Sequence, residues 1–237
     1  MQLALSSAAL PNAPIDTLRR AAQRRDLKGL ELVLGAGHAH GIGTPSESAP
    51  SVVDEGRPKK GGIPPVQWLF AGKKPSITDV LYWGRQAALL DAGLLLRNTI
   101  PETPLGVPLA LVHGTDLQEA QRAAAWARVH DAKTCWNVEL GQRKPAQFAD
   151  VLDATLPTLA HVRLLGAGPE TQSAAPGTAG TGAVLKELAL NGYAHTVALT
   201  PSANGSTSEW REWLFEGRGW GCGTAAQKKA ARAESAS

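Results

Sequence analysis

The chain has 237 residues, of which 43% are hydrophobic and 19% are charged. This composition supports a full hydrophobic core and excludes a disordered chain, and the length suits one closed α/β barrel of roughly 200 to 250 residues. The formal net charge is +3, and residues 224–237 carry Lys228, Lys229 and Arg232 against Glu234. We therefore expect a basic flexible tail on a nearly neutral body, and we do not expect binding to nucleic acid.

The cysteine content and the apolar runs limit the class of protein further. Two cysteines, Cys135 and Cys222, are too few for a disulfide framework, and Cys135 stands in an apolar run where burial is expected. The N-terminal segment has no basic residues before its short apolar run, so it does not resemble a signal peptide. No apolar run reaches the roughly 18 residues of a membrane span. We expect a cytoplasmic protein with no membrane association.

Eight short apolar runs alternate with segments of helix length along the chain. The runs cover residues 2–6, 30–34, 66–71, 93–98, 108–113, 133–140, 160–165 and 195–200. Near-continuous apolar runs of this length are typical of parallel strands that are buried on both faces. The pattern therefore predicts eight parallel strands.

Most of the intervening segments are typical of helices. They cover residues 14–26, 76–92, 115–131, 144–157, 181–192 and 208–217. Ser76, followed three residues later by Asp79, predicts a capped helix start, while Gly192 and Gly217 predict helix ends. Strands alternating with helices predict a (β/α)8 TIM barrel as a single domain over residues 1–223. An open doubly wound sheet is the structural alternative.

Residues 35–65 interrupt this alternation. Gly, Pro and Ser dominate the segment and no helical period is visible, so an irregular long loop is expected in place of the helix after the second strand. A loop of this length is either a functional lid or a disordered segment. His38 and His40 in this loop are candidates for a metal site with His113 and Glu31, although two histidines in a Gly-rich loop are more typical of a surface.

Candidate anion-binding residues lie where the predicted strands end, which is where barrels of this kind place their active sites. Arg97, His113 and Arg163 follow or end three strands, and arginine forks suit carboxylate or phosphate. The alternative is that Arg163 pairs with an internal acid such as Glu139 or Glu31.

A Gly-rich loop before the helix that follows the seventh strand offers a second candidate anion site. Gly180, Thr181 and Gly182 stand at the predicted helix start, where backbone N–H groups can receive a phosphate. The alternative is that Thr181 only caps the helix. The Gly pattern alone is a weak signal.

Aromatic and acidic residues complete the set of candidates. Trp68 is a candidate wall for a sugar, although aromatic residues in strands are more often part of the core. Glu31 and Glu139 are candidates for acid–base catalysis, because a sugar epimerase needs one group to remove a proton and one to return it. A carboxylate beside Arg163 would, however, keep a low pKa and be a poor base.

Two parts of the chain resemble the xylose isomerase-like TIM barrel superfamily. Residues 2–32, QLALSSAALPNAPIDTLRRAAQRRDLKGLEL, resemble the first βαβ unit of its sugar phosphate isomerases and epimerases and of the related metal-dependent apurinic endonucleases. Residues 160–168 (AHVRLLGAG) and 181–202 (TGAVLKELALNGYAHTVALTPS) resemble the last two strands. The resemblance implies a barrel that acts on sugars or sugar phosphates.

The resemblance also implies a divalent cation, bound by Glu, Asp, His and Glu on strands five to eight. The corresponding positions here hold Val112 or His113, Asn137, Arg163 and Thr200. Valine cannot ligate a cation, and two positive charges 4 Å apart repel by about 4 kcal/mol at an effective dielectric constant of 20. We therefore expect the metal site to be degenerate, with no metal or other cofactor.

Three functions are consistent with the sequence. The first is a sugar or sugar-phosphate isomerase or epimerase, which rests on resemblance of fold alone. The second is a non-catalytic relative that binds a small anionic or sugar ligand, and the third, least favoured, is a metal-dependent phosphodiesterase or endonuclease. The expected ligand-binding residues are Arg97, His113, Asn137, Arg163, Thr200, Trp68, Gly180, Thr181 and Gly182.

Overall fold

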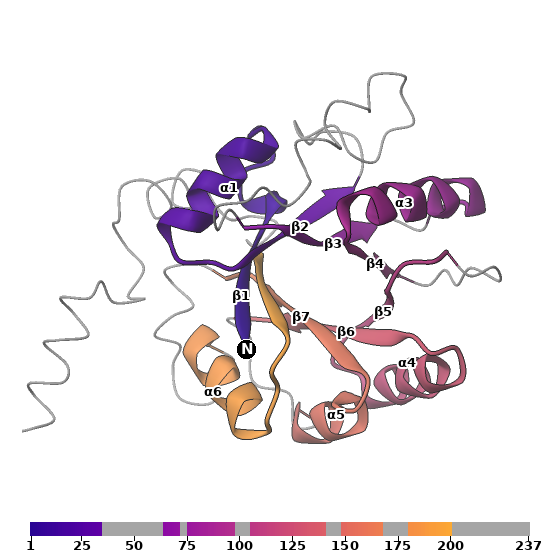
Figure 1. Ribbon diagram of the computed structural model, residues 1–237. Helices are drawn as coiled ribbons and strands as arrows, with labels where there is room; N and C mark the ends of the chain where they lie inside the picture. The colour runs from indigo at the N-terminus through magenta and orange to yellow at the C-terminus, as the bar shows by residue number, and fades with distance from the viewer. Residues whose placement is uncertain (35–63, 72–74, 98–104, 141–147, 168–179, 201–237) are drawn as a thin grey trace, which may run out of the picture.

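The computed structural model describes residues 1–34, 64–71, 75–97, 105–140, 148–167 and 180–200. Eight parallel strands close into a barrel in chain order, and the helices surround it (Figure 1). The strands are β1 (Gln2–Ser6), β2 (Gly29–Leu34), β3 (Val66–Ala71), β4 (Gly93–Leu96), β5 (Leu109–His113), β6 (Lys133–Glu139), β7 (Leu159–Leu165) and β8 (Thr196–Thr200). The predicted (β/α)8 TIM barrel is confirmed, and the open sheet is excluded.

The α-helices match the predicted segments wherever the structure describes them, while a short 3-10 helix after β1 was not predicted. They are the short 3-10 helix η1 (Ser7–Ala9) and the α-helices α1 (Ile15–Arg24), α3 (Ile77–Leu90), α4 (Leu117–Val129), α5 (Phe148–Thr155) and α6 (Thr181–Leu190). The capping box of Ser76 and Asp79 is present, and Gly192 follows α6 with a φ of 75°. The segments 35–63 and 201–237, which hold the long loop, the last predicted helix and the basic tail, lie outside the described residues.

Two separate apolar clusters show which way each strand residue points. The larger cluster joins strand residues such as Leu32, Leu164 and Leu199 to helix residues, so it fills the space between barrel and helices. The smaller cluster contains strand residues alone and fills the barrel interior, with Trp68, Phe70, Leu95, Ala110, Val112 and Cys135. Successive residues of a strand point to opposite faces, so the two clusters also show whether each neighbouring side chain points into the barrel or towards the helices.

Two register shifts place additional residues inside the barrel. Leu30 pairs with Val66 and Glu31 with Trp68, which leaves Gln67 as an extra residue in β3. A similar shift in β7 pairs Cys135 with His161. Such bulges change the direction of a side chain and are frequent next to functional sites. Here Trp68 and His161 both point inward, with their ring centroids 5.6 Å apart.

Gly93 in β4 gives the Trp68 ring its space, and this predicts a large effect of a small change. A Cβ atom at Gly93 would lie 2.2 Å from Cζ3 of Trp68. We expect Gly93→Ala to lower the free energy of unfolding by about 1–3 kcal/mol, because the core must shift to admit the methyl group. Gly182→Ala is the control: apart from its chain neighbours and the backbone of its own helix, no described atom lies within 4 Å of the added Cβ, and alanine favours the helix. Equal stabilities of the two variants in urea titrations would contradict the prediction.

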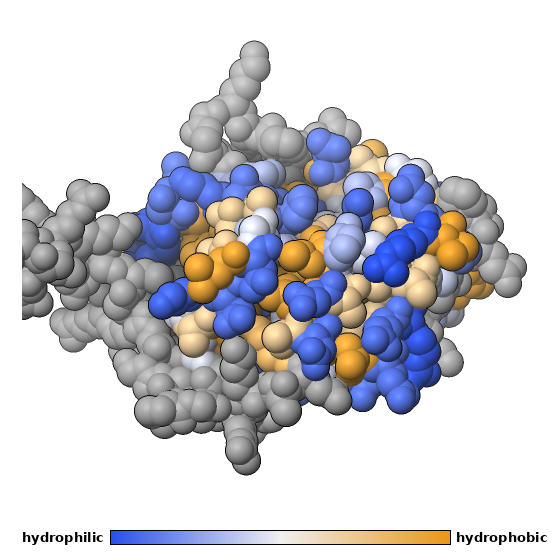
Figure 2. Space-filling model, turned by 90° about the horizontal axis from the view of Figure 1, so that it is seen from below, coloured by the Kyte–Doolittle hydropathy of each residue, from blue (hydrophilic) through white to orange (hydrophobic). Residues whose placement is uncertain are grey.

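The outer surface is mixed in character. Hydrophobic and hydrophilic residues interleave on the face drawn in Figure 2. Across the described ranges, no helix combines the length and the apolar character that crossing a membrane requires.

Candidate functional site

A buried carboxylate lies at the centre of the barrel's polar interior. Glu31 in β2 has no exposed surface. It accepts hydrogen bonds from Ser6 Oγ at 2.9 Å, His161 Nε2 at 2.9 Å and Arg163 Nε at 2.8 Å. Burying a charge costs several kcal/mol unless it is paired and hydrogen-bonded, and these three donors meet that requirement.

The Arg163 side chain is held from three sides. Besides the ion pair with Glu31, it donates from Nη1 to Asn137 Oδ1 at 3.4 Å. Its guanidinium carbon lies 3.6 Å from the centroid of the Phe70 ring, which is the geometry of a cation–π contact. The Arg163 side chain is 5% exposed, whereas Asn137 is half-buried. Of these two hydrogen-bonded residues, Asn137 is therefore the one in contact with solvent.

The protonation states of the group follow from burial and proximity. Burial alone would raise the pKa of Glu31, but the Arg163 charge and the His161 hydrogen bond outweigh it and lower that pKa to about 2. Burial lowers the pKa of His161 below its usual value. At neutral pH His161 is therefore neutral. The negative charge of Glu31 and the positive charge of Arg163 cancel.

Glu31 is poorly suited to the acid–base role predicted for it. A general base works best with a pKa near the working pH, and the pKa of Glu31 lies far below that range. Glu31 instead positions Arg163, as the alternative interpretation of Arg163 predicted. The other candidate acid, Glu139, is exposed at the last position of β6 and makes no such pair.

Thr200 ends β8 with an unsatisfied hydroxyl. It lies on the inner face, because Thr196 four residues earlier donates across the barrel interior to Gln67 Oε1. Thr200 is 5% exposed, and its buried Oγ1 has no hydrogen-bond partner among the residues that the structure describes. A buried hydroxyl of this kind at the C-terminal end of a barrel strand is a candidate ligand contact.

The structure does not bring His113 and Arg97 into this group. Val112 belongs to the inner cluster, so His113 points outward, where its ring stacks on Trp136 at a centroid distance of 6.5 Å. The position that corresponds to the family glutamate on strand five is therefore Val112. Arg97 is exposed immediately after β4. The predicted cluster of two arginines and His113 does not form among the described side chains.

The remaining predicted residues occupy separate places. Trp68 is 8% exposed inside the barrel, against His161. Gly180 is the N-cap of α6 and Thr181 its first residue, so Thr181 is not the cap. Gly182 follows in the first turn, and residues 168–179 lie outside the described ranges. The phosphate site at the start of α6 stays a prediction.

Ser6, Phe70 and His161 complete the group. Ser6 stands where the first predicted strand ends, and Phe70 is a candidate wall for a sugar together with Trp68, whereas His161 is not among the predicted site residues. His161 could have been found, because it stands two residues before Arg163 and so shares its face of the strand. Ser6 ends β1 in the way that Thr200 ends β8.

The described residues do not fit the divalent cation that the family resemblance implies. No group of three or more His, Cys, Asp or Glu side chains in the described ranges is placed to hold a metal ion. Val112 has no ligating atom, and the Arg163 guanidinium adds a positive charge at the seventh strand. His38 and His40 lie outside the described residues. The absence of a metal from the whole chain stays a prediction.

Comparison with known proteins shows the fold. No family model and no curated sequence matches the chain. Endonuclease IV from Thermus thermophilus matches with a TM-score of 0.55 and 14% identity, over 91% of this chain and 100% of that one. D-allulose 3-epimerase from Methylomonas sp. matches with a TM-score of 0.57 and 9% identity, over 86% and 85%. The chain thus shares its barrel fold with an endonuclease IV and an epimerase, the two classes of enzyme that the sequence resembles.

Proposed function

We propose that the protein binds a small sugar or sugar derivative at the C-terminal end of the barrel. The observation that carries this proposal is the Arg163 guanidinium, oriented by Glu31 and Phe70 beside the half-buried Asn137. A donor that is already oriented loses little conformational freedom when a ligand arrives. The unsatisfied hydroxyl of Thr200 supplies a further group that can donate to or accept from a sugar hydroxyl.

The charges of the group favour hydroxyl groups over a phosphate as the part of the ligand bound there. Glu31 already offsets the charge of Arg163, and the lowered pKa of His161 keeps that ring neutral. A phosphate brought to this place would lose its hydration without meeting an uncompensated positive charge. The preference for an anion that Arg163 suggested by itself is therefore weakened by its partner.

An isomerase or epimerase is the second candidate function. It is favoured by the exposed Glu139 at the end of β6 and by the fold shared with an epimerase. Incubation of candidate sugars in D₂O tests it, because proton removal at carbon exchanges hydrogen for deuterium. Exchange that Glu139→Gln abolishes would support catalysis, and binding without any exchange would leave the protein a binder.

Thr200→Val provides the sharpest test of the proposed site. The change is nearly isosteric and removes a hydroxyl without a partner, so we expect unchanged or slightly higher stability. We expect sugar affinity to fall about tenfold, which corresponds to about 1.4 kcal/mol. Calorimetric titration with neutral sugars and their phosphates measures both the affinity and the ligand class.

Thr196→Val is the matched control on the same strand and the same face. Its hydroxyl is hydrogen-bonded to Gln67, so we expect a loss of about 1 kcal/mol in stability with no change in sugar affinity. Equal effects of the two variants on affinity would contradict the proposed site. Binding of the sugar phosphates alone would contradict the preference for hydroxyl groups, and binding of no sugar at all would exclude the function.

A further inference from the structure

The outer side of α3 is apolar, although the helix already buries its inner side against the barrel. Among the residues that the structure describes, six large hydrophobic side chains are exposed, and three of them belong to this one helix. Ile77 is 54% exposed, Leu81 42% and Leu89 45%, while Val80 and Leu90 on the inner side are buried. A helix that is hydrophobic all round is normally covered all round, so we expect a partner over the outer side of α3.

The outer side of α3 carries a single charge, that of Arg85. Its exposed positions are Ile77, Thr78, Leu81, Arg85, Ala88 and Leu89. The exposed positions of α1, in contrast, are polar or charged and hold Asp16, Arg20, Gln23 and Arg24. Helices that lie on a lipid surface combine an apolar face with several Lys or Arg residues beside it, which α3 lacks. The composition of this face therefore favours a protein partner over a membrane.

The barrel also lacks a described helix beside α3 on the side of β5. The chain passes from β4 to β5 through residues 97–108, which leaves little room for a helix of the usual roughly 11 residues. In Figure 1, β4 and β5 lie between α3 and α4 with no described helix over them. The Leu105 side chain covers part of this gap, since it lies 3.1 Å from where a Cβ atom of Gly84 would stand. Gly84 neighbours Leu81 on the surface of α3, so the apolar outer side continues into the gap.

The exposed residues of α3 have the same spacing when read from either end. Ile77 and Leu89 stand six residues before and after Trp83. Leu81 and Arg85 stand two residues before and after it. An antiparallel pair of α3 helices, related by a two-fold axis at this position, would therefore bring Ile77 against Leu89 at both ends and Leu81 against the aliphatic part of Arg85. The two guanidinium groups would be offset by about 6 Å along the helices, so that like charges do not meet head on.

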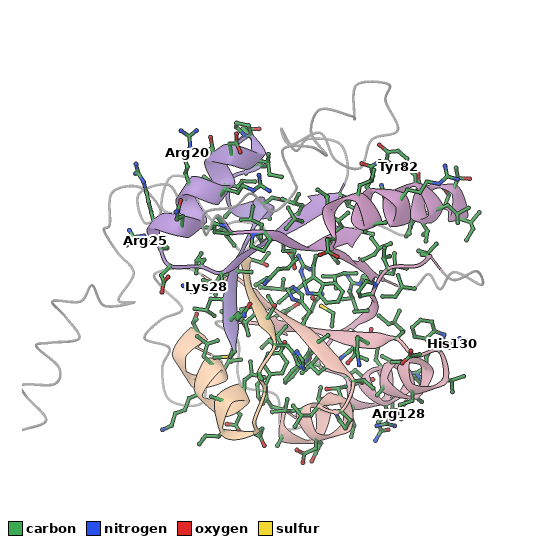
Figure 3. All side chains as sticks on the ribbon, viewed as in Figure 1. Arg20, Arg25, Lys28, Tyr82, Arg128 and His130 are labelled. Atoms are coloured by element: carbon green, nitrogen blue, oxygen red, sulfur yellow. The ribbon has the colours of Figure 1, made fainter. Side chains whose placement is uncertain are left out.

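We propose that two copies of this chain associate through α3, packed antiparallel about a two-fold axis near Trp83. Each copy then supplies a helix beside α3 of the other, where the described residues hold none. Two-fold pairs are the commonest homo-oligomers, and they need only a patch that is complementary to itself, as the spacing on α3 makes this one. Tyr82 lies on the side of α3 away from the strands (Figure 3), where its ring can stack on Arg85 of the second copy.

The length of α3 limits the strength of this association. The helix has 14 residues and is about 21 Å long, so the contact is smaller than a standard interface of about 1,600 Å². We expect a monomer–dimer equilibrium of the full chain between about 1 µM and about 1 mM protein, measured by sedimentation equilibrium. Leu81→Lys places a second positive charge opposite Arg85 of the other copy and should weaken the dimer at least about tenfold. Val129→Lys is the matched control and should change nothing, because Val129 is 79% exposed on a different helix, α4.

Disulfide formation between two variants tests the antiparallel arrangement. In a Cys222→Ser background, a mixture of Ile77→Cys and Leu89→Cys chains should form mixed disulfides under mild oxidation, whereas neither variant alone should link to itself. The two copies of position 77 would be about 18 Å apart along the helices, which is beyond the reach of a disulfide. Cys135 is buried and should not interfere.

Four results would count against the proposed dimer. A monomer at every concentration would overturn it, and so would equal weakening by Leu81→Lys and Val129→Lys. Self-linking of the Ile77→Cys chain as fast as the mixed disulfide would exclude the antiparallel pair. Binding to phosphatidylcholine vesicles that Leu81→Lys abolishes would assign the outer side of α3 to a lipid surface instead.

Discussion

Replacing Arg163 with methionine is expected to lower the free energy of unfolding by about 3–5 kcal/mol, as found for buried ion pairs that lose one partner. The loss arises because Glu31, which has no exposed surface, would keep its charge without the guanidinium that now lies 2.8 Å away. Urea titration followed by tryptophan fluorescence measures the change. A loss below about 1 kcal/mol, the value typical of exposed pairs, would contradict the described burial.

The double variant Glu31→Leu with Arg163→Met shows whether the loss belongs to the pair. Removing both charges leaves no uncompensated ion. We therefore expect the double variant to lose less unfolding free energy than the two single variants lose together, by roughly 2 kcal/mol or more. Lys28→Met is the surface control. Lys28 pairs with Asp26, and their side chains are 56% and 86% exposed, so its removal should cost little. Additive effects of Glu31→Leu and Arg163→Met would indicate that the two groups act independently.

Acid is expected to destabilise the protein in two steps. The pKa of Glu31 falls from 4.5 to about 2 on folding, so its contribution is present above 4.5 and is lost as the pH falls towards 2. A shift of this size corresponds to about 3 kcal/mol in total. Burial also lowers the pKa of His161 and of His113 in the folded state. As the pH falls below 6.5, the ordinary pKa of histidine, these two side chains bind protons in the unfolded chain before they do so in the folded protein. The loss of stability therefore begins near this pH.

Unfolding titrations over the range from about pH 8 to about pH 3 resolve the two steps. The double variant that lacks Glu31 and Arg163 should lose the step below pH 4.5 and keep the step that begins near 6.5. His113→Phe should reduce the higher step alone. An identical dependence on pH for the double variant and the unchanged protein would show that Glu31 does not carry the acid step.

The sequence was sufficient to predict the barrel because its strands are buried on both faces. That burial produces continuous apolar runs, and each of the eight predicted runs overlaps an observed strand. The same property hides which residues point inward. In Leu109–His113 the first four residues are apolar, so no alternation distinguishes Val112 from His113. The outward direction of His113 follows instead from the place of Val112 in the inner cluster.

The candidate site was predicted in part for a related reason. Arg163, Asn137 and Thr200 could be placed at strand ends, which fixes the end of the barrel to which they belong. The partner of Arg163 could only be narrowed to an internal acid, because Glu31 is 132 positions away in sequence and becomes adjacent only on closure. The register shift at the start of β7 has no signature in the residues around it, whereas the direction of His161 could have been inferred from its spacing of two residues from Arg163.

The distance along the chain between Glu31 and Arg163 also has a consequence for the order of folding. During synthesis the ribosome releases β2 long before β7. For a time, therefore, the N-terminal half of the barrel contains the Glu31 carboxylate but not the Arg163 guanidinium that pairs with it. Closing a loop of this length carries an entropic cost that only the completed pairing offsets. We therefore expect partial chains that end before β7 to remain open, and the barrel to close as one late, cooperative event.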